Sequence, residues 1–157
     1  MNVTFAPAPQ VDPVTSVLRD TAREGGAVVP QSTGCGINLL TSDGRRITSA
    51  ATDRIAERLN ALYDAYRENP CSTALLSGTV VATDLSRPSL SLWATRAAEL
   101  GVRSIMTTAL RTPERMLGTV LVYSTGDEAF RPGAADMFLM FARTAALRID
   151  ACMLGAR

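Results

Sequence analysis

The sequence contains no histidine and no lysine, and all 16 of its basic residues are arginine. Without histidine the chain has no imidazole for acid–base catalysis, for binding haem or zinc, or for accepting a phosphoryl group. Without lysine it cannot form a Schiff base with a substrate or cofactor. These absences exclude several common classes of enzyme, and we expect the chain not to be an enzyme.

Cysteine is also scarce. The three cysteines, Cys35, Cys71 and Cys152, are odd in number and share no metal-ligand spacing, so we expect neither a disulfide framework nor a metal site. The first ten residues lack the basic start and apolar run of a signal peptide. No stretch approaches the ~18 apolar residues of a membrane span. A reducing, cytoplasmic setting without a membrane follows as the simplest expectation.

The net charge gives no sign of a strongly charged partner. The 16 basic residues face 15 acidic ones, which gives a net charge of +1, so no overall field attracts nucleic acid and we expect no direct binding to it. The length of 157 residues suits one domain. We expect a loose tail over residues 1–11, which holds two prolines, and a single domain over residues 12–157.

What the sequence does have is a clear succession of helices and strands. Residues 102–111 and 116–124 predict two strands joined by the short turn Thr112–Arg115, and strands joined so tightly must be antiparallel. Three further strands are predicted at 35–40, 46–51 and 79–85. Helices are predicted from Asp12-Pro13 to Gly25-Gly26 and over 53–67, 70–78, 89–100 and 133–153. Hairpins among helices indicate the α+β class, an antiparallel sheet with helices on its faces.

Six short segments, in their order along the chain, resemble a known family. They are Gly36-Ile37-Asn38-Leu39-Leu40, Ala50-Ala51-Thr52-Asp53, Glu68-Asn69-Pro70-Cys71, Val80-Val81-Ala82-Thr83-Asp84-Leu85, Ala97 through Ser104, and Leu117 through Ser124. Together they resemble a GAF domain, a sensory fold related to PAS domains. The resemblance is greatest to the actinobacterial type that often precedes an RNA-binding ANTAR segment in transcription antiterminators, although the sequence ends without such a segment.

The resemblance implies an architecture. It predicts about six antiparallel strands with the terminal helices on one face and a pocket on the other, roofed by the helices at 53–67 and 89–100. It also implies a homodimer formed through the terminal helices. GAF domains bind ligands as different as cyclic nucleotides, bilins, haem and amino acids, so the family name does not identify a ligand or cofactor here.

Cys71 is the most distinctive single residue. As the second residue of a helix capped by Asn69, its thiol would lie near unpaired backbone N–H groups, which favour the thiolate and lower its pKa. That environment would suit a redox-sensitive or ligand-contacting thiol. Packing as a small buried side chain is the alternative, and the commoner fate of a free cysteine.

Aromatic and polar residues around the expected pocket complete the candidate site. Trp93, Tyr63 and Tyr66 could stack on a ligand or simply pack in the core. Arg96 could bind a carboxylate or phosphate, or pair with Glu99 or Asp84. The candidate ligand contacts are Tyr63, Tyr66, Cys71, Trp93, Arg96, Ser104, Met106, Thr107 and Thr108.

Three functions are open at this point. The first is a sensory domain, in transcription regulation or signal transduction, that binds a small molecule and signals through its terminal helices. The second is a dimerisation module whose pocket has collapsed onto Trp93 and Tyr66. The third is a thiol-based redox sensor or an enzyme like free methionine-(R)-sulfoxide reductase. Residues 72–110 contain no second cysteine, which argues against the enzyme because sulfoxide reduction needs a resolving thiol.

Overall fold

The computed structural model describes residues 12–128 and 130–155, so the tail predicted at residues 1–11 lies outside the described residues. The elements are α1 (Pro13–Val28), β1 (Gly34–Leu40), β2 (Arg46–Ala51), α2 (Arg54–Ala65), α3 (Pro70–Ser77), β3 (Val81–Asp84), α4 (Leu92–Glu99), β4 (Ser104–Arg111), β5 (Met116–Ser124) and α5 (Ala134–Gly155). Each predicted helix and strand is present, with ends that differ by a few residues.

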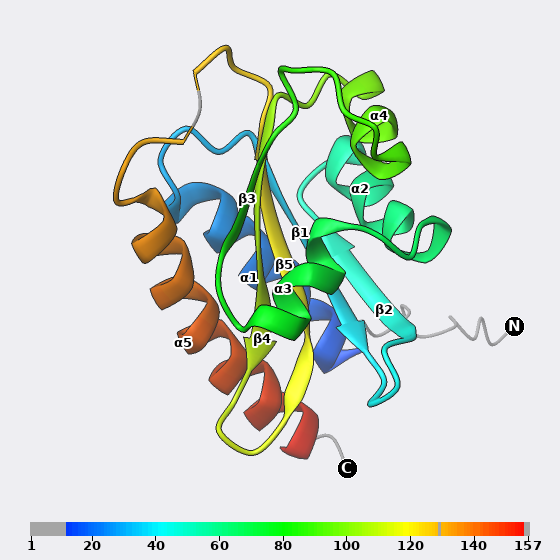
Figure 1. Cartoon of the computed structure of the whole chain (residues 1–157). Helices are drawn as coiled ribbons and strands as arrows, with labels where there is room; N and C mark the ends of the chain where they lie inside the picture. The colour runs from blue at the N-terminus through cyan, green and yellow to red at the C-terminus, as the bar shows by residue number, and fades with distance from the viewer. Residues whose placement is uncertain (1–11, 129, 156–157) are drawn as a thin grey trace, which may run out of the picture.

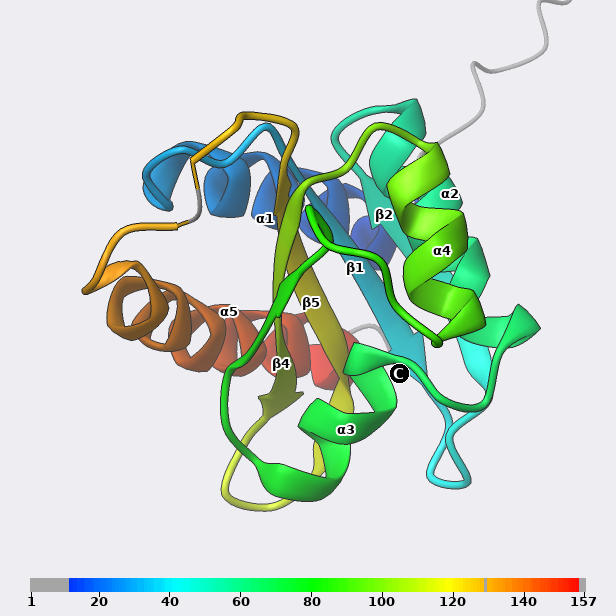
Figure 2. The ribbon, with the colours of Figure 1, turned by 45° about the horizontal axis from the view of Figure 1, so that its top comes forward.

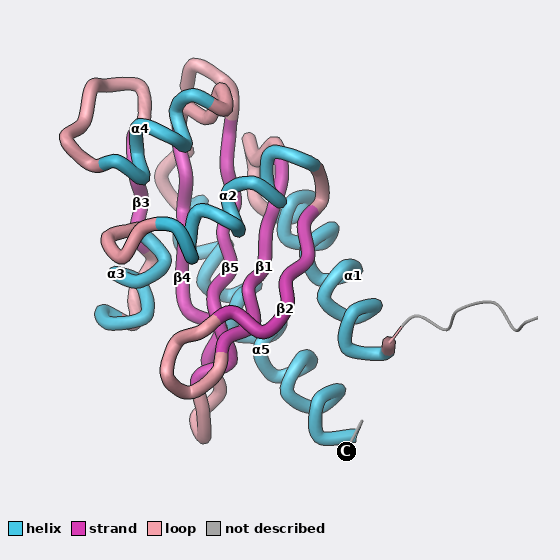
Figure 3. The backbone as a smooth tube through the Cα atoms, turned by 90° about the vertical axis from the view of Figure 1, so that its right-hand side faces the viewer, coloured by secondary structure: helices cyan, strands magenta, loops and turns pink. Residues whose placement is uncertain are grey.

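The structure has three layers, with the sheet between two groups of helices (Figures 1 and 3). The strand order is β2-β1-β5-β4-β3, and every neighbouring pair is antiparallel. The terminal helices α1 and α5 cover one face of the sheet, and α2, α3 and α4 cover the other (Figure 3). The expected α+β class is confirmed.

The expected number of strands is wrong: the described residues form a sheet of five strands, not about six. The five are those that the sequence itself predicts, and the sixth came only from the family resemblance. Between α2 and β4 the chain forms α3, the short β3, a loop of residues 85–91 and α4. That loop contains Pro88 and five serines or leucines in irregular order, and proline cannot donate to a strand ladder.

β4 and β5 form a hairpin of two adjacent strands in the sheet. Thr107 lies opposite Leu121 in its register, and the backbone N–H of Thr112 donates to the carbonyl of Arg115 across the turn, at 2.9 Å. β5 also pairs with β1, where Val120 lies opposite Ile37. β5 is therefore the middle strand of the sheet.

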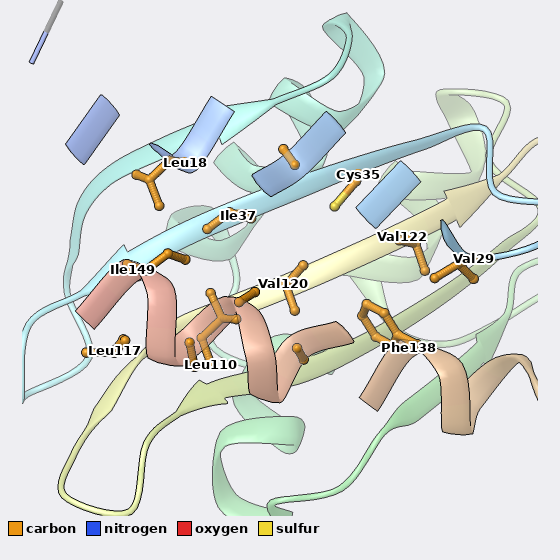
Figure 4. Close-up of a cluster of buried hydrophobic side chains, with 14 of the residues drawn as sticks. Leu18, Val29, Cys35, Ile37, Leu110, Leu117, Val120, Val122, Phe138 and Ile149 are labelled. Carbon is orange, nitrogen blue, oxygen red and sulfur yellow. The ribbon is translucent and has the colours of Figure 1, made fainter. Parts of the chain in front are cut away.

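The core beneath the terminal helices is dry and apolar (Figure 4). Leu18 of α1 and Phe138 and Ile149 of α5 are fully buried there against Ile37 and Val120 of the sheet. An ion pair between Arg148 and Glu24, with 2.6 Å between nitrogen and oxygen, ties α5 to α1 at the surface. None of the described helices is long and apolar enough to cross a membrane.

The end of α1 differs from prediction. The pair Gly25-Gly26 was expected to end this helix, but the helix continues to Val28. A side chain at Gly25 would come within 2.8 Å of the ring of Phe141 on α5 and 2.9 Å of the sulfur of Cys35. Gly25 thus permits close packing of α1 on its neighbours instead of terminating the helix.

Candidate functional site

The candidate site is the face of the sheet covered by α2, α3 and α4, here called the α2–α4 face. Strand residues alternate between faces, and Ile105, Leu121 and Tyr123 point to this side, where they pack with Leu59 and Trp93. Trp93 is only 2% exposed and Tyr123 only 1%. The protein's own side chains therefore fill the space in which the resemblance predicts a pocket.

The structure brings five further candidate residues to this face or its rim. Thr107 is fully buried, and its hydroxyl lies 3.4 Å from the carbonyl oxygen of Val81. Tyr63 and Tyr66 are half-buried at the rim; the phenol of Tyr63 donates to the carbonyl of Gly44 at 2.6 Å. Cys71, the fourth, is the second residue of α3 and is buried in the core of this face.

Arg96, the fifth, is an exposed residue of α4. Its guanidinium Nε donates to the phenol oxygen of Tyr66 at 3.4 Å, and another nitrogen forms an ion pair with Glu99 at 3.0 Å. The contact with Tyr66 links α4 to the end of α2, whereas the ion pair with Glu99 lies within α4. Of the two partners considered from sequence, Glu99 is the one that Arg96 contacts.

Three other candidates point away from the α2–α4 face, so placing them around one cavity with Trp93 is wrong. Met106 belongs to the core beneath α1 and α5. Ser104 and Thr108 share its face because residues two apart in a strand point to the same side. The Thr108 hydroxyl lies 3.4 Å from the carbonyl of Thr79, whereas the buried hydroxyl of Ser104 has no partner among the described residues.

Cys71 does not have the electrostatic character predicted from its place in the helix. The side chain is 3% exposed, and burial raises the pKa of the thiol to about 12, although a hydrogen bond with Thr119 acts in the opposite direction. A lowered pKa was therefore the wrong prediction, because loss of water disfavours the thiolate more than the helix start favours it. At neutral pH Cys71 is a protonated, buried thiol.

Two buried asparagines on this face were missed from sequence. The side-chain amide of Asn60 on α2 donates to the carbonyl of Ala50 at 3.0 Å, and that of Asn38 on β1 donates to the carbonyl of Asn60 at 3.3 Å. The side-chain oxygens of both residues are buried and have no partner among the described residues. Asn38, a polar residue amid the apolar strand Gly34–Leu40, was the available signal.

A second polar group lies at the start of α2. The carboxylate of Asp53 caps the helix by accepting a 2.9 Å bond from the N–H of Ala56, and Oδ1 also accepts one of 2.6 Å from the phenol of Tyr123. Burial raises the pKa of Asp53, but the bonds from Tyr123, Ala56 and Thr52 outweigh it, and the net pKa is lowered. Burial and the nearby carboxylate raise the pKa of Tyr123.

The described residues contain no cluster of three or more histidine, cysteine, aspartate or glutamate side chains placed to hold a metal ion. The chemistry of the site is thus that of hydrogen-bonding amides, a neutral thiol and aromatic rings. Such groups suit recognition of a small molecule.

Comparison with known proteins decides the family. A model of the GAF domain matches residues 12–149. The chain belongs to the GAF family. No curated protein is similar enough to count as a match.

Solved GAF structures share the fold at low sequence identity. GAF3 of Slr1393 from Synechocystis sp. PCC6803, in its photoproduct state, has a TM-score of 0.66 at 12% identity, covering 92% of this chain and 98% of that one. A GAF domain/HD domain protein from Geobacter sulfurreducens has 0.66 at 15%, covering 94% and 98%. The phycocyanobilin-bound GAF domain of a cyanobacterial phytochrome has 0.63 at 14%, covering 90% and 87%. GAF domains are sensory and regulatory modules, and this chain has their fold.

Proposed function

We propose that this GAF domain is a sensor for a small molecule that binds on the α2–α4 face, and that Trp93 closes the site in the present conformation. The observation that carries the proposal is the pair of buried oxygens of Asn38 and Asn60, which have no donor among the described residues. A buried acceptor without a donor costs free energy. A ligand with an N–H or O–H group would supply that donor.

Entry of a ligand requires the covering helices to move, and α4 is the element best suited to do so. It has eight residues, of which only Trp93, Ala94 and Ala97 are buried in the core. A groove of about 510 Å³ lies between α4 and the loop of residues 85–89. Leu90 and Leu92, which precede Trp93, are 104% and 66% exposed. They offer apolar area that can cover a ligand after Trp93 leaves its place.

We assign the transmission of the signal to α5. Met137, Met140, Thr144, Leu147, Ala151 and Leu154 follow one another at alternating spacings of three and four residues. All six are exposed. We call this row the α5 stripe. Alternating spacings of three and four are typical of paired helices, and the four large side chains of the stripe are 43–68% exposed. A homodimer formed through α5 would cover them and carry the response between subunits.

Binding of a bilin is not part of this proposal. The related GAF domain of a cyanobacterial phytochrome is bound to phycocyanobilin, but the residues here do not fit a bilin held covalently. The only cysteine on the α2–α4 face is Cys71, which is buried with a raised pKa, and Trp93 occupies the interior. We propose instead a non-covalent ligand, no catalytic activity, and a role in transcription regulation or signal transduction, exerted without direct contact to nucleic acid.

The single tryptophan of the chain makes a direct test. A library of nucleotides, amino acids and other metabolites is screened by thermal shift, and each hit is titrated while the fluorescence of Trp93 is recorded. We expect a hit to raise the melting temperature and to change the emission as Trp93 moves. In Asn38→Leu, which keeps the branching of the side chain but removes the unpartnered oxygen together with the donor to Asn60, the response to that hit should be lost, whereas Arg67→Gln at the surface should retain it.

A purely structural dimerisation module is the second candidate, and the filled interior around Trp93 favours it. It predicts a stable dimer with no response to any compound. Flat melting temperatures and unchanged Trp93 emission across the library would contradict the sensor and leave this alternative.

A further inference from the structure

A separate pocket lies on the opposite side of the sheet from Trp93. It has a volume of about 430 Å³ and is formed by the end of β4, the turn after it and the middle of α5, which lie side by side in Figures 1 and 2. Its walls include Thr108, Arg111, Pro113, Leu139, Arg143 and Leu147.

The hollow exists because β3 is short. Its four residues pair only with Ser104–Thr107, the first half of β4. Beyond Thr107 the chain leading to β3 turns away toward Gly78, where α3 ends. Leu139 and Leu147 on α5 therefore face a stretch of β4 that no outer strand covers, and this leaves an apolar recess at the edge of the sheet.

The charges at this recess are all of one sign. Arg111 and Arg143 are among its lining residues, and no aspartate or glutamate is. Arg143 forms no ion pair with any described residue. A nitrogen of Arg111 lies 3.4 Å from the carbonyl of Leu75, the one polar partner of its side chain among the described residues. Two arginines with no acidic residue in the same lining make the recess electropositive, and this charge favours an anion there.

We propose that this pocket is a second binding site, which takes an amphipathic carboxylate with an unbranched apolar chain. The planar guanidinium forks of Arg111 and Arg143 hold the carboxylate, for which their geometry is suited. The chain of the ligand lies along Leu139, Leu147 and Pro113, where it replaces water on apolar surface. The volume falls within the range of small-molecule sites, about 300–1,000 Å³.

The site is also placed to influence the dimer. Leu147 belongs both to the wall of the pocket and to the α5 stripe, and it is 57% exposed. A ligand held against Leu147 thus lies at the border of the surface that the proposed dimer buries. This binding site stands independently of the sensor proposed for the α2–α4 face, since it shares no lining residue with it.

The test uses decanoate and the full chain. Amide resonances are followed by NMR during titration with decanoate, with decanol of the same chain length, and with acetate. We expect decanoate to shift the resonances of residues 108–113 and 139–147 and to leave the fluorescence of Trp93 unchanged. Decanol lacks the charge and acetate lacks the chain, so both should bind much more weakly.

Matched variants assign the binding to the arginines. Arg143→Gln should weaken decanoate binding about tenfold, as expected for the loss of charge-assisted hydrogen bonds, and Arg111→Gln combined with it should weaken binding further. Arg67→Gln makes the same change of net charge at an exposed position outside the pocket and should bind as the original chain does. Equal affinity for decanoate and decanol, unaltered binding by the double variant, or shifts confined to the α2–α4 face would each overturn the proposal.

Discussion

The phenol of Tyr123, on the central strand β5, donates a 2.6 Å hydrogen bond to the carboxylate that caps α2, that of Asp53. The two residues are 70 positions apart in the sequence. The bond ties the first turn of a covering helix to the middle of the sheet. A side chain at Gly34 would collide with both Asp53 and the ring of Tyr123, so the small residue at that position is part of the same arrangement.

The first prediction concerns Tyr123→Phe. Loss of this bond to a charged group should lower the free energy of unfolding by about 1.5–3 kcal/mol at neutral pH. Since the folded-state pKa of Asp53 is depressed, its contribution to stability is complete above the unfolded pKa of about 4 and is lost as the pH falls through the folded value. The difference between Tyr123→Phe and the original chain should therefore shrink below about pH 4.

Urea unfolding measured across this pH range gives the comparison. Tyr66→Phe is the control, because its phenol makes only a 3.4 Å contact with the exposed Arg96, and it should change stability by no more than about 0.5 kcal/mol. Equal losses of stability in Tyr123→Phe and Tyr66→Phe would show that the bond from Tyr123 to Asp53 adds no stability.

The second prediction concerns Gly36, whose missing side chain leaves room for the amide of Asn60. Gly36→Ala should displace Asn60 and weaken its bonds to Ala50 and Ile37, at a cost of about 2–4 kcal/mol from crowding and unpaired polar groups. Gly26→Ala is the matched control: the nearest atoms lie 3.8 Å away, and alanine in this helix should be neutral or stabilise by up to about 1 kcal/mol. Thermal unfolding measures both, and a harmless Gly36→Ala would contradict the packing described here.

The third prediction concerns thiol reactivity. With a pKa raised by burial to about 12, Cys71 should not react with iodoacetamide in the folded protein at pH 7–8, and the buried Cys35 should behave in the same way. Cys152, which is partly exposed, should be labelled first. Mass spectrometry after timed labelling gives the rates, with unfolded protein as the positive control. Labelling of native Cys71 as fast as Cys152 would instead support the redox-sensor hypothesis.

The fourth prediction concerns the proposed dimer. Met140 is 68% exposed near the middle of the α5 stripe. Met140→Glu should convert a dimer into monomers, because pairing would bury two unpaired carboxylates. Leu76→Glu changes an apolar side chain that is 91% exposed on α3, and should leave the dimer intact. Analytical ultracentrifugation decides the matter: a monomeric original chain, or a Met140→Glu variant that stays dimeric, would reject this interface.

Local signals explain what the sequence could predict. The β4–β5 hairpin follows from two apolar segments around a four-residue turn, and the five strands are recognisable from such patterns alone. Contacts between distant residues explain most of what was missed. Gly25 resembles a helix end, yet its role is to let α1 approach Phe141. Neither that contact nor the burial that raises the pKa of Cys71 is visible in neighbouring residues.

The face of the sheet to which each strand residue points, in contrast, can be predicted from the sequence. Residues two apart in β4 share a face, so Thr107 and Thr108 could not both reach Trp93. Ser104, Met106 and Thr108 share one face of β4 and Thr107 lies on the other, so the four cannot line one cavity. The buried asparagines are harder to predict, because Asn60 is buried only when α2 packs across β1 at Gly36.

The middle strand gives the architecture a mechanical property. Along β5, Leu121 and Tyr123 belong to one core, while Val120 and Val122 belong to the other. The two cores thus meet through a single backbone, with no intervening layer to absorb a displacement. A shift of this strand by a fraction of a residue would therefore disturb both sets of packed side chains together.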